Sequence, residues 1–524
     1  MSESKNVRFG PETWSKGSRG KVRAHATDKA LLENVHVWTD GLLGPRPWWQ
    51  DNSVTLSANI TATSKIVAAI SDDDVNGNGY TGLLAVSTNE VEFYRSDDNY
   101  ASSWANNATG VATAHRNSWV SQADRFKYLV GDYLIEMEGS GANITATLAD
   151  ISTVFNASAT FGITGSCVHQ GRAFYWGSRS LGGGLWARNE IFYSDAYDWV
   201  VFASTAQQFQ VDGAVAGAVS LGQNLVIWTT HGQWYVLQGR GDPATATLNY
   251  VGLQRIPPIF QQPAVMDNQA YFMSSDGGAL CVVGPNGHVN DKQFLHLGEG
   301  TDPSATSSAS DYLDPAASSR FNSLVIPLQG DRNYLSSYEG IWYEEYLSGA
   351  LYDDKQFTIN EETGRNYLIE WNTSTSRWDV YYRPVADTNL DSDLASGSFA
   401  TGFLETTAAE VHLPRIHEST KQVRVRRVII DGMTWASSST TKPNAELTVK
   451  VTDGKGGDHT LTLGPASQPL SSVPNTSRTP IRITATPNTV LPYTHFSDVW
   501  FDAMQGIAIE SVTVEAEVSQ GPVS

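Results

Sequence analysis

Short segments in which apolar and polar residues alternate recur along most of the chain, and most of them fold back at a Gly, Asn or Asp. Alternation with a period of two is the pattern of strands with one buried face, whereas the 3.6-residue period of amphipathic helices is almost absent. Clear examples surround Asn89, Gly131, Gly171 and Gly222. The pattern predicts an all-β protein built from hairpins.

The turns of these hairpins are regularly spaced along the chain. Successive turns are 42, 40, 51, 46, 54 and 44 residues apart, at Asn89, Gly131, Gly171, Gly222, Asn268, Asn322 and Asn366. A period of about 40 to 50 residues is typical of the four-stranded blades of a β-propeller. Closure into a ring also leaves few strand edges unpaired. The spacing predicts a propeller-like array of short antiparallel sheets with six or seven blades, and a row of β-sandwiches is the alternative.

The pattern changes near both ends of the chain. Beyond the Gly, Ser and Ala residues at 395–402 the strands are longer, and Leu447, Val449 and Val451 alternate with polar residues as in a sheet with one wet face. The first 50 residues instead combine tryptophans with basic residues and prolines. We therefore predict an N-terminal arm at residues 1–55, a propeller-like body at 56–402 and a C-terminal β-sandwich at 403–524.

Composition and charge narrow the class of protein. The 524 residues include 45 Gly, 16 Trp and 21 Tyr with only 17% charged residues, which favours a turn-rich protein with aromatic strands. The 55 acidic and 35 basic residues give a net charge of −20, which opposes tight binding of phosphate backbones. Cys167 and Cys281 have apolar neighbours, so we expect them in the core.

Targeting signals are not evident in the sequence. The N-terminus lacks the apolar region of a signal peptide, and no run approaches the ~18 apolar residues of a membrane helix. We therefore expect a chain that is made in the cytoplasm and has no membrane span.

Three groups of segments carry a further pattern. They are Asn34–Val37 with Asp40–Pro47; Gly171–Gly177 with Asn189–Asp195 and Asp198–Trp199; and Leu225–Thr229 with Gly232–Gly239, Pro257–Pro258 and Asp276–Gly278. Residues 30–290 thereby resemble the tail nozzle, or tail tubular protein B-like, family of short-tailed bacteriophages. The Trp-rich arm departs from that pattern, and the C-terminal sandwich fits a minor tail or baseplate protein of a long-tailed phage equally well.

The resemblance implies a structural protein of the virion tail, made in the host cytoplasm. Its partners would be copies of itself in a ring, as a hexamer, together with portal or adaptor and other tail proteins, and DNA would pass through only in transit. It implies no catalytic residues. The negative charge agrees with a conduit, because each Lys or Arg contact to a phosphate adds affinity and would slow the DNA. Selection for solubility explains an acidic protein equally well.

The residues themselves point to no catalytic centre, and among 55 acidic residues a glycosidase pair of carboxylates stays an open alternative. The eleven histidines are scattered, and neither a catalytic triad nor a metal-binding spacing is present. We expect no cofactor. A carbohydrate-binding or carbohydrate-hydrolysing propeller, in which exposed aromatic rings stack on sugars, and a monomeric scaffold for partner peptides are the alternative functions.

One segment resembles half of a calcium loop. Asp72, Asp74 and Asn76 stand at positions 1, 3 and 5 and are followed by a glycine, as in an EF-hand loop. The acid required at position 12 is replaced by Leu83, and Tyr80 stands at position 9. A simple Asn/Asp/Gly surface turn explains the same residues. Calcium is therefore the alternative to a plain turn.

Two sets of residues are candidates for an interface between subunits. Arg424 and Arg426 lie on one face of a predicted strand at 422–430, where they either form a solvated, charge-protected edge or meet an acidic neighbouring subunit. The tryptophans of the N-terminal region either fill a core or anchor an interface, since aromatic residues dominate contact energies between subunits. They are Trp14, Trp38, Trp48 and Trp49.

Overall fold

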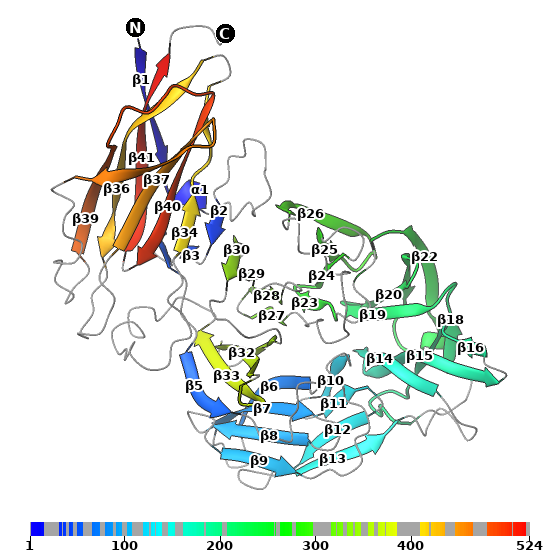
Figure 1. Cartoon of the computed structure of the whole chain (residues 1–524). Coiled ribbons are helices and arrows are strands. Elements are labelled where there is room, and N and C mark those ends of the chain that lie inside the picture. Colours follow the sequence, from blue (N-terminus) through cyan, green and yellow to red (C-terminus); the bar gives the residue numbers. More distant parts are fainter. Residues whose placement is uncertain are drawn as a thin grey trace.

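The molecule has two β-rich parts, a ring of small sheets and a flattened barrel of longer strands (Figure 1). This computed structural model describes residues 2–14, 31–33, 35–37, 41–45, 50–55, 65–73, 79–86, 91–96, 102–106, 119–124, 127–131, 133–138, 145–151, 161–182, 185–201, 207–255, 257, 262–274, 279–296, 316–320, 322–327, 333–338, 341–346, 355–360, 365–372, 374–384, 409–418, 421–434, 446–464, 479–505 and 507–519. Helices in these ranges are the short α1 (Pro11–Trp14) and a 3-10 turn at Pro243–Thr245. The predicted all-β fold class is confirmed.

Seven antiparallel groups of four or five strands follow each other along the described chain, and we number them as blades 1 to 7. Six of them are separate sheets, and blade 6 is continuous with the sheet of the second part. Blade 1 is β6 (Lys65–Asp73), β7 (Gly79–Val86), β8 (Val91–Ser96) and β9 (Ser102–Asn106). Blade 2 is β10 (Val120–Asp124), β11 (Lys127–Val130), β12 (Tyr133–Glu138) and β13 (Thr145–Asp150). Blade 3 is β14 (Phe161–His169), β15 (Arg172–Gly182), β16 (Leu185–Ala187), β17 (Glu190–Tyr193) and β18 (Gln208–Gln210).

The remaining blades have four strands each. Blade 4 is β19 (Val215–Leu221), β20 (Asn224–Thr229), β21 (Gln233–Gln238) and β22 (Thr247–Leu253). Blade 5 is β23 (Ala264–Met266), β24 (Gln269–Met273), β25 (Ala279–Val283) and β26 (Val289–His296). Blade 6 is β27 (Ala316–Ser318), β28 (Ser323–Pro327), β29 (Asn333–Tyr338) and β30 (Ile341–Tyr346), and blade 7 is β31 (Lys355–Asn360), β32 (Arg365–Asn372), β33 (Arg377–Pro384) and β5 (Gln50–Thr55).

The ring closes between blade 7 and blade 1. First strands of neighbouring blades lie against each other from blade 2 to blade 4, and from blade 5 through blades 6 and 7 to blade 1, where β31 contacts β6. Between blades 4 and 5, β19 contacts β24. Strand β5 comes before blade 1 in the sequence, yet it pairs with β33 as the outer strand of blade 7. Two distant segments thus share one sheet, and their backbone hydrogen bonds hold the ring shut. The predicted propeller is confirmed, and β5 extends it to Gln50.

The predicted turn residues are confirmed at several hairpins. Gly131, Gly171 and Gly222 have φ of 54°, 74° and 61°, and Asn268 and Asn322 also have positive φ. These are conformations that Gly adopts freely and Asn tolerates. Asn366 is different, because it lies inside β32 and pairs with Ile359 and Arg383.

Buried aromatic rings join neighbouring blades. Trp119 of blade 2 packs edge-on against Trp176 of blade 3, with ring centroids 4.9 Å apart, and lies 5.8 Å from Trp228 of blade 4. Trp228 stacks on Trp234, which stacks on Phe272 of blade 5. Offset and edge-on ring pairs contribute about 0.5 to 1.5 kcal/mol each beyond their buried area. From blade 2 to blade 5 the core therefore continues from one blade to the next.

Glycines make room for two of these tryptophans. Gly165 pairs with Trp176 and Gly217 pairs with Trp228, each beside a register shift in the first strand of its blade. A Cβ on Gly217 would lie 2.3 Å from the Trp228 ring, and one on Gly165 would lie 2.4 Å from the Trp176 ring. Only glycine fits at either position. The predicted core positions of the cysteines are also confirmed, since both Cys167 and Cys281 are buried free thiols.

The second part, which we call the sandwich, is built from both ends of the chain. Its strands are β1 (Ser2–Phe9), β2 (Leu31–Glu33), β3 (Val35–Val37), β4 (Leu43–Pro45), β34 (Ala409–His412), β35 (Ile416–His417), β36 (Val423–Thr434), β37 (Glu446–Asp453), β38 (Asp458–Leu463), β39 (Thr479–Pro487), β40 (Phe496–Gln505) and β41 (Ile507–Ser519). Strands β34, β40 and β37 form one layer and β39, β36 and β41 the other, and β38 joins the layers by pairing with β37 and β39.

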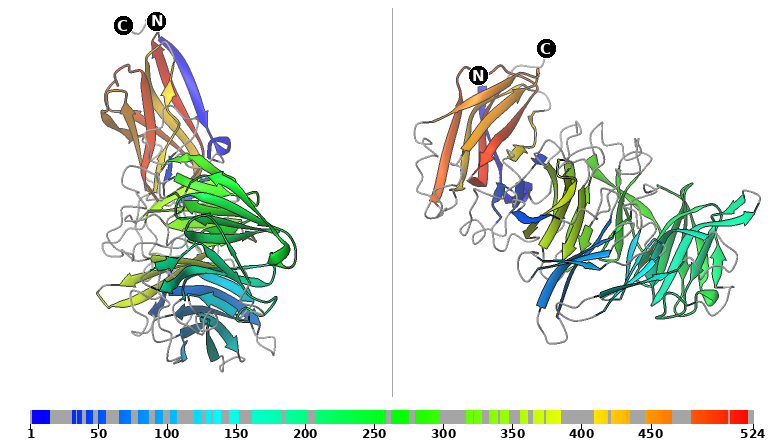
Figure 2. Two further views of the ribbon diagram at one scale, coloured as in Figure 1. Left: turned by 90° about the vertical axis from the view of Figure 1, so that its right-hand side faces the viewer. Right: turned by 60° about the horizontal axis from the view of Figure 1, so that its bottom comes forward.

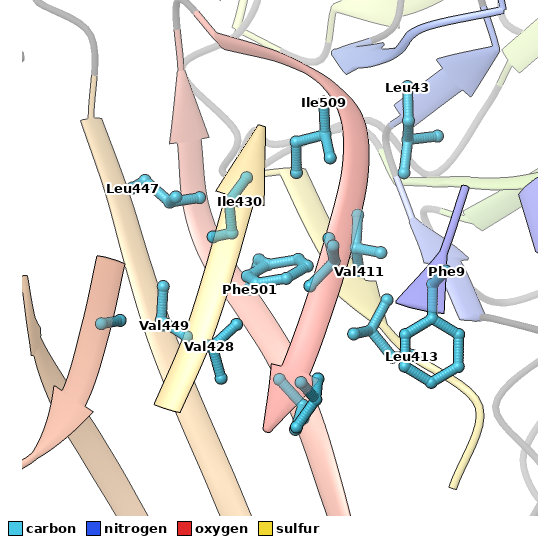
Figure 3. Close-up of a cluster of buried hydrophobic side chains, with 14 of the residues drawn as sticks. Phe9, Leu43, Val411, Leu413, Val428, Ile430, Leu447, Val449, Phe501 and Ile509 are labelled. Carbon is cyan, nitrogen blue, oxygen red and sulfur yellow. The ribbon is translucent and has the colours of Figure 1, made fainter. Parts of the chain in front are cut away.

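The N-terminal segment completes this sandwich. Strand β1 pairs antiparallel with β41 from Ser2 opposite Ser519 to Phe9 opposite Val512. Both ends of the chain accordingly lie together, away from the propeller (Figure 2). Phe9 and Leu43 face Val411, Val428 and Phe501 in one buried cluster (Figure 3). The propeller is therefore inserted into the sandwich, and the domain boundaries expected at 55 and 403 divide that sandwich between two predicted parts.

A tight junction connects the sandwich to blade 6. Strand β2 pairs with β34 on one side and with β30 on the other, where Glu33 lies opposite Glu344. Tyr343 of β30 is fully buried in the hydrophobic cluster of the sandwich and stacks on His36, with ring centroids 4.2 Å apart. One sheet and one core thus continue from the propeller into the sandwich.

Candidate interaction surface

Three arginines of β36 lie on the outer side of the sandwich. In a regular strand, consecutive residues point to opposite faces, so Arg426 and Arg427 could not both face solvent. A β-bulge between Val425 and Arg427 inserts one extra residue opposite β41. Both arginines are therefore exposed, with Val425 and Val428 buried on either side of them. Together with Arg424 they form what we call the arginine face.

Carboxylates of the neighbouring strand β41 bind these arginines. Arg424 Nε donates to Glu517 Oε2 at 2.7 Å, and Arg426 donates to Glu517 Oε1 at 2.7 Å. Arg427 Nε donates to Glu515 Oε2 at 2.9 Å. The hydrogen bond from Arg424, reinforced by one from the Tyr493 hydroxyl, holds the pKa of Glu517 below its usual range. One carboxylate, that of Glu517, thus serves two guanidinium groups.

Several other charged side chains of these strands form ion pairs with one acid each. Lys5 of β1 bonds Glu418, and Lys421 lies 3.4 Å from Glu3. Arg482 of β39 lies 3.6 Å from Asp431. Exposed pairs of this kind stabilise a fold by about 0 to 1 kcal/mol each. The arginine face differs from them because it holds three cations against two acids.

Sequence pattern predicted part of this surface. Arg424 and Arg426 are predicted to share a face because they alternate with Val423 and Val425, and the same alternation continued would put Arg427 on the opposite face. The signal that reveals the bulge is the shift of the buried positions, from 423 and 425 to 428 and 430. The partner acids leave a weaker signal, since they alternate with buried apolar residues on a distant strand.

The acidic charge of the protein is concentrated in the propeller. Residues 51–384 contain 35 acidic and 17 basic residues, a net charge of −18. The rest of the chain, which forms the sandwich and its connections, contains 20 acidic and 18 basic residues, a net charge of −2. The two parts of the molecule thus differ strongly in charge, and the arginine face lies on the nearly neutral part.

The structure places one of the four candidate tryptophans. Trp14, at the end of α1, is fully buried in the sandwich core, and its indole N–H has no hydrogen-bond partner among the described residues. It fills a core in this chain, which is one of the two roles considered for it. Trp38, Trp48 and Trp49 lie outside the described residues.

The half calcium loop is described only at its start. Asp72 belongs to β6, whereas Asp74 and Asn76 lie outside the described residues. Within the described part of the chain, no three His, Cys, Asp or Glu side chains come together as a metal-binding group. Nor does any helix described there have the length and apolar character to cross a membrane.

An aromatic ring on the opposite layer of the sandwich bears on sugar binding. Trp500 of β40 stacks on His412 of β34 with ring centroids 5.0 Å apart, and Lys450 of β37 lies 4.3 Å from the centre of a Trp500 ring. Strand β40 lies between β34 and β37, so the two neighbours contact the indole from opposite sides. Stacking on a sugar requires a free ring face, and this indole offers none.

Comparison with known proteins gives similarity of fold only. No protein-family model matches the sequence, and no curated protein matches it. A crystal structure of BBS1N in complex with ARL6DN has a TM-score of 0.40 and 12% identity, over 65% of this chain and 98% of that chain. BamB from Moraxella catarrhalis has a TM-score of 0.33 and 12% identity, over 63% and 98%. Raptor from Chaetomium thermophilum has a TM-score of 0.37 and 9% identity, over 64% and 29%. We base the propeller assignment on the strand pairing described above, and we take no function from these proteins.

Proposed function

We propose that this chain is a structural subunit of a bacteriophage tail, of the nozzle type, that assembles as a ring around the path of the DNA. Residues 30–290 resemble that family in sequence, and the described strands of this range from Gln50 onward belong to the propeller. The net charge of −18 on the propeller suits a surface past which DNA must move without binding. No catalytic step is part of the proposal.

The observation that carries the proposal is the junction between propeller and sandwich. A protein that holds a channel open under load needs parts that keep a fixed mutual position. Domain contacts within a chain are usually polar and permit relative motion. Here β2 pairs with strands of both parts, and Tyr343 is fully buried in the sandwich core. The two parts therefore form one continuous body, which is the property that a load-bearing subunit requires.

Native mass spectrometry and electron microscopy of the purified full chain test this function. We expect a closed ring, most simply a hexamer, that forms as the protein concentration rises. Double-stranded DNA should bind it weakly and without sequence preference. A chain that stays monomeric at the highest concentration reached, or that hydrolyses glycans, would contradict the proposal and favour a carbohydrate-active propeller.

A further inference from the structure

We propose that the arginine face of the sandwich, formed by Arg424, Arg426 and Arg427, binds the acidic propeller of a second copy of this chain. The contact is head to tail, because the sandwich of one copy meets the propeller of the next. This inference rests on the proposed ring and names the surface through which the ring forms.

The first argument is the bulge in β36. A bulge leaves one residue unpaired and disrupts the local ladder of hydrogen bonds, and such bulges commonly re-aim side chains. The bulge between Val425 and Arg427 brings Arg426 and Arg427 onto the side that already carries Arg424. Without the bulge, regular alternation would place only two of the three arginines on this face. The bulge thus adds a third positive charge to this side of the sandwich.

The second argument is the imbalance of charge within the arginine face. Glu517 is nearly buried and accepts hydrogen bonds from Arg424, Arg426 and Tyr493. Its single negative charge cannot neutralise both arginines. The Arg426 side chain is 61% exposed, so the surplus positive charge is available to a partner. Guanidinium groups bind carboxylates with paired hydrogen bonds, which makes an acidic protein surface a suitable partner.

The third argument is the distribution of charge between the two parts. Two copies that met through their propellers would each bring a net charge of −18 to the contact. Contact between the arginine face and a propeller instead places surplus positive charge against negative charge. Complementary charges of this kind steer association and select the orientation of the partners. A head-to-tail contact also uses two different surfaces, and repetition of such a contact closes into a ring when the rotation allows it.

Phosphate groups of a nucleic acid are a weaker match to this surface. Proteins that bind DNA through its backbone use many cations with few acids among them. Glu515 and Glu517 lie within hydrogen-bonding distance of these arginines, and the whole chain is at −20. A nucleic acid would therefore be repelled by the same carboxylates that hold the arginines in place.

Mass photometry of the full chain over a range of concentrations and salt tests the contact. Arg426→Glu should weaken self-association about tenfold at low salt. Arg426→Lys should keep most of it. The control is Lys455→Glu, which reverses the charge of an exposed lysine in the turn between β37 and β38, on the sandwich but outside the arginine face. It should associate as the wild-type chain does, and added salt should weaken the wild-type assembly.

Different failures separate this inference from the proposed function. A ring that forms equally well with Arg426→Glu would overturn the arginine contact and leave the ring intact. Binding of duplex DNA by the wild-type chain that Arg426→Glu abolishes would overturn the contact in favour of a nucleic-acid site. A chain that never associates would overturn the ring and the contact together. Unchanged thermal unfolding of each variant shows that the effect lies at the surface.

Discussion

The propeller and the sandwich are both completed by pairing between strands that are far apart in the sequence. The ring of blades closes when β5 pairs with β33, and its core passes from blade to blade through Trp119, Trp176 and Trp228. The sandwich takes both of its layers from the C-terminal segment, and β1, β2 and β4 of the N-terminal segment pair with the strands β41 and β34 of those layers. Each part is thus completed by a segment from the N-terminal region.

Charge follows the same division. The propeller holds nearly all of the net negative charge, whereas the sandwich is nearly neutral and three arginines on its outer side share two carboxylates. Screening makes exposed charges weak contributors to stability, so the acidic propeller must be held by its apolar core. Stability in both parts therefore comes mainly from buried contacts, and charge enters our proposal only through association between copies.

Removal of the Trp14 side chain should destabilise the sandwich more than the propeller. Trp14→Ala empties the volume of a fully buried indole, and such changes cost about 3 to 5 kcal/mol. Trp14→Phe is the control, because it keeps an aromatic ring and removes an indole N–H that has no partner among the described residues.

Hydrogen exchange measured segment by segment separates the two parts. With Trp14→Ala, exchange should rise in β36 and β41 and stay slow in β20 and β21 of the propeller. Equal acceleration in both parts would mean that they unfold as one unit, and the division drawn here would not hold for stability.

A methyl group at Gly217 should destabilise the propeller. The new Cβ would lie 2.3 Å from the Trp228 ring and 2.6 Å from the Trp119 ring, so at least one tryptophan must move. Overpacking of this kind costs about 1 to 3 kcal/mol. We expect Gly217→Ala to lower the denaturation midpoint, measured by tryptophan fluorescence.

Gly162→Ala is the matched control for this variant. Gly162 lies in the first strand of blade 3, and a Cβ there would approach only Ser178, at 3.8 Å. Its midpoint should stay within experimental error of the wild-type value. A loss equal to that of Gly217→Ala would point to the strand backbone, and away from the ring of tryptophans, as the source of the effect.

Local sequence pattern predicted the propeller better than the way it closes. Turn residues such as Gly171 and Gly222 fix hairpins because they adopt positive φ, and this requirement is local. The pairing of β1 with β41 and of β5 with β33 depends on segments far apart in the sequence, and alternation shows which face is buried but not which strand lies alongside. Domain boundaries read along the chain therefore could not show a propeller inserted into a sandwich.

The arginine face was likewise predictable only where local sequence pattern was sufficient. Arg424 and Arg426 were visible as exposed positions of one strand, whereas Arg427 required the bulge and Glu517 required the partner strand. The sequence also contains a repeated glycine and tryptophan pair that alternation alone does not reveal. Gly165 with Trp176 and Gly217 with Trp228 have the same spacing in successive blades. Two copies of such a pair become informative only when the register shows that each glycine lies opposite its tryptophan.

Acid should lower the stability of the propeller because one of its histidines is buried. His169 of blade 3 is nearly fully buried, and its Nδ1 lies 2.8 Å from Ser220 Oγ of blade 4. Burial lowers its pKa from 6.5 to about 4. Above pH 6.5 the ring is neutral in the folded and unfolded chains, so stability does not depend on it.

As the pH falls from 6.5 towards 4, only the unfolded chain takes up the proton at His169, and stability must fall. The loss should reach about 2 kcal/mol at pH 5 and about 3 kcal/mol below pH 4, since one pKa unit corresponds to about 1.4 kcal/mol. Urea unfolding at pH 7 and pH 5 measures it. His169→Gln should lose this part of the pH dependence, whereas the same change at the exposed His288 should keep it. If the two variants respond alike, the acid sensitivity originates elsewhere, and the contact between blades 3 and 4 does not set it.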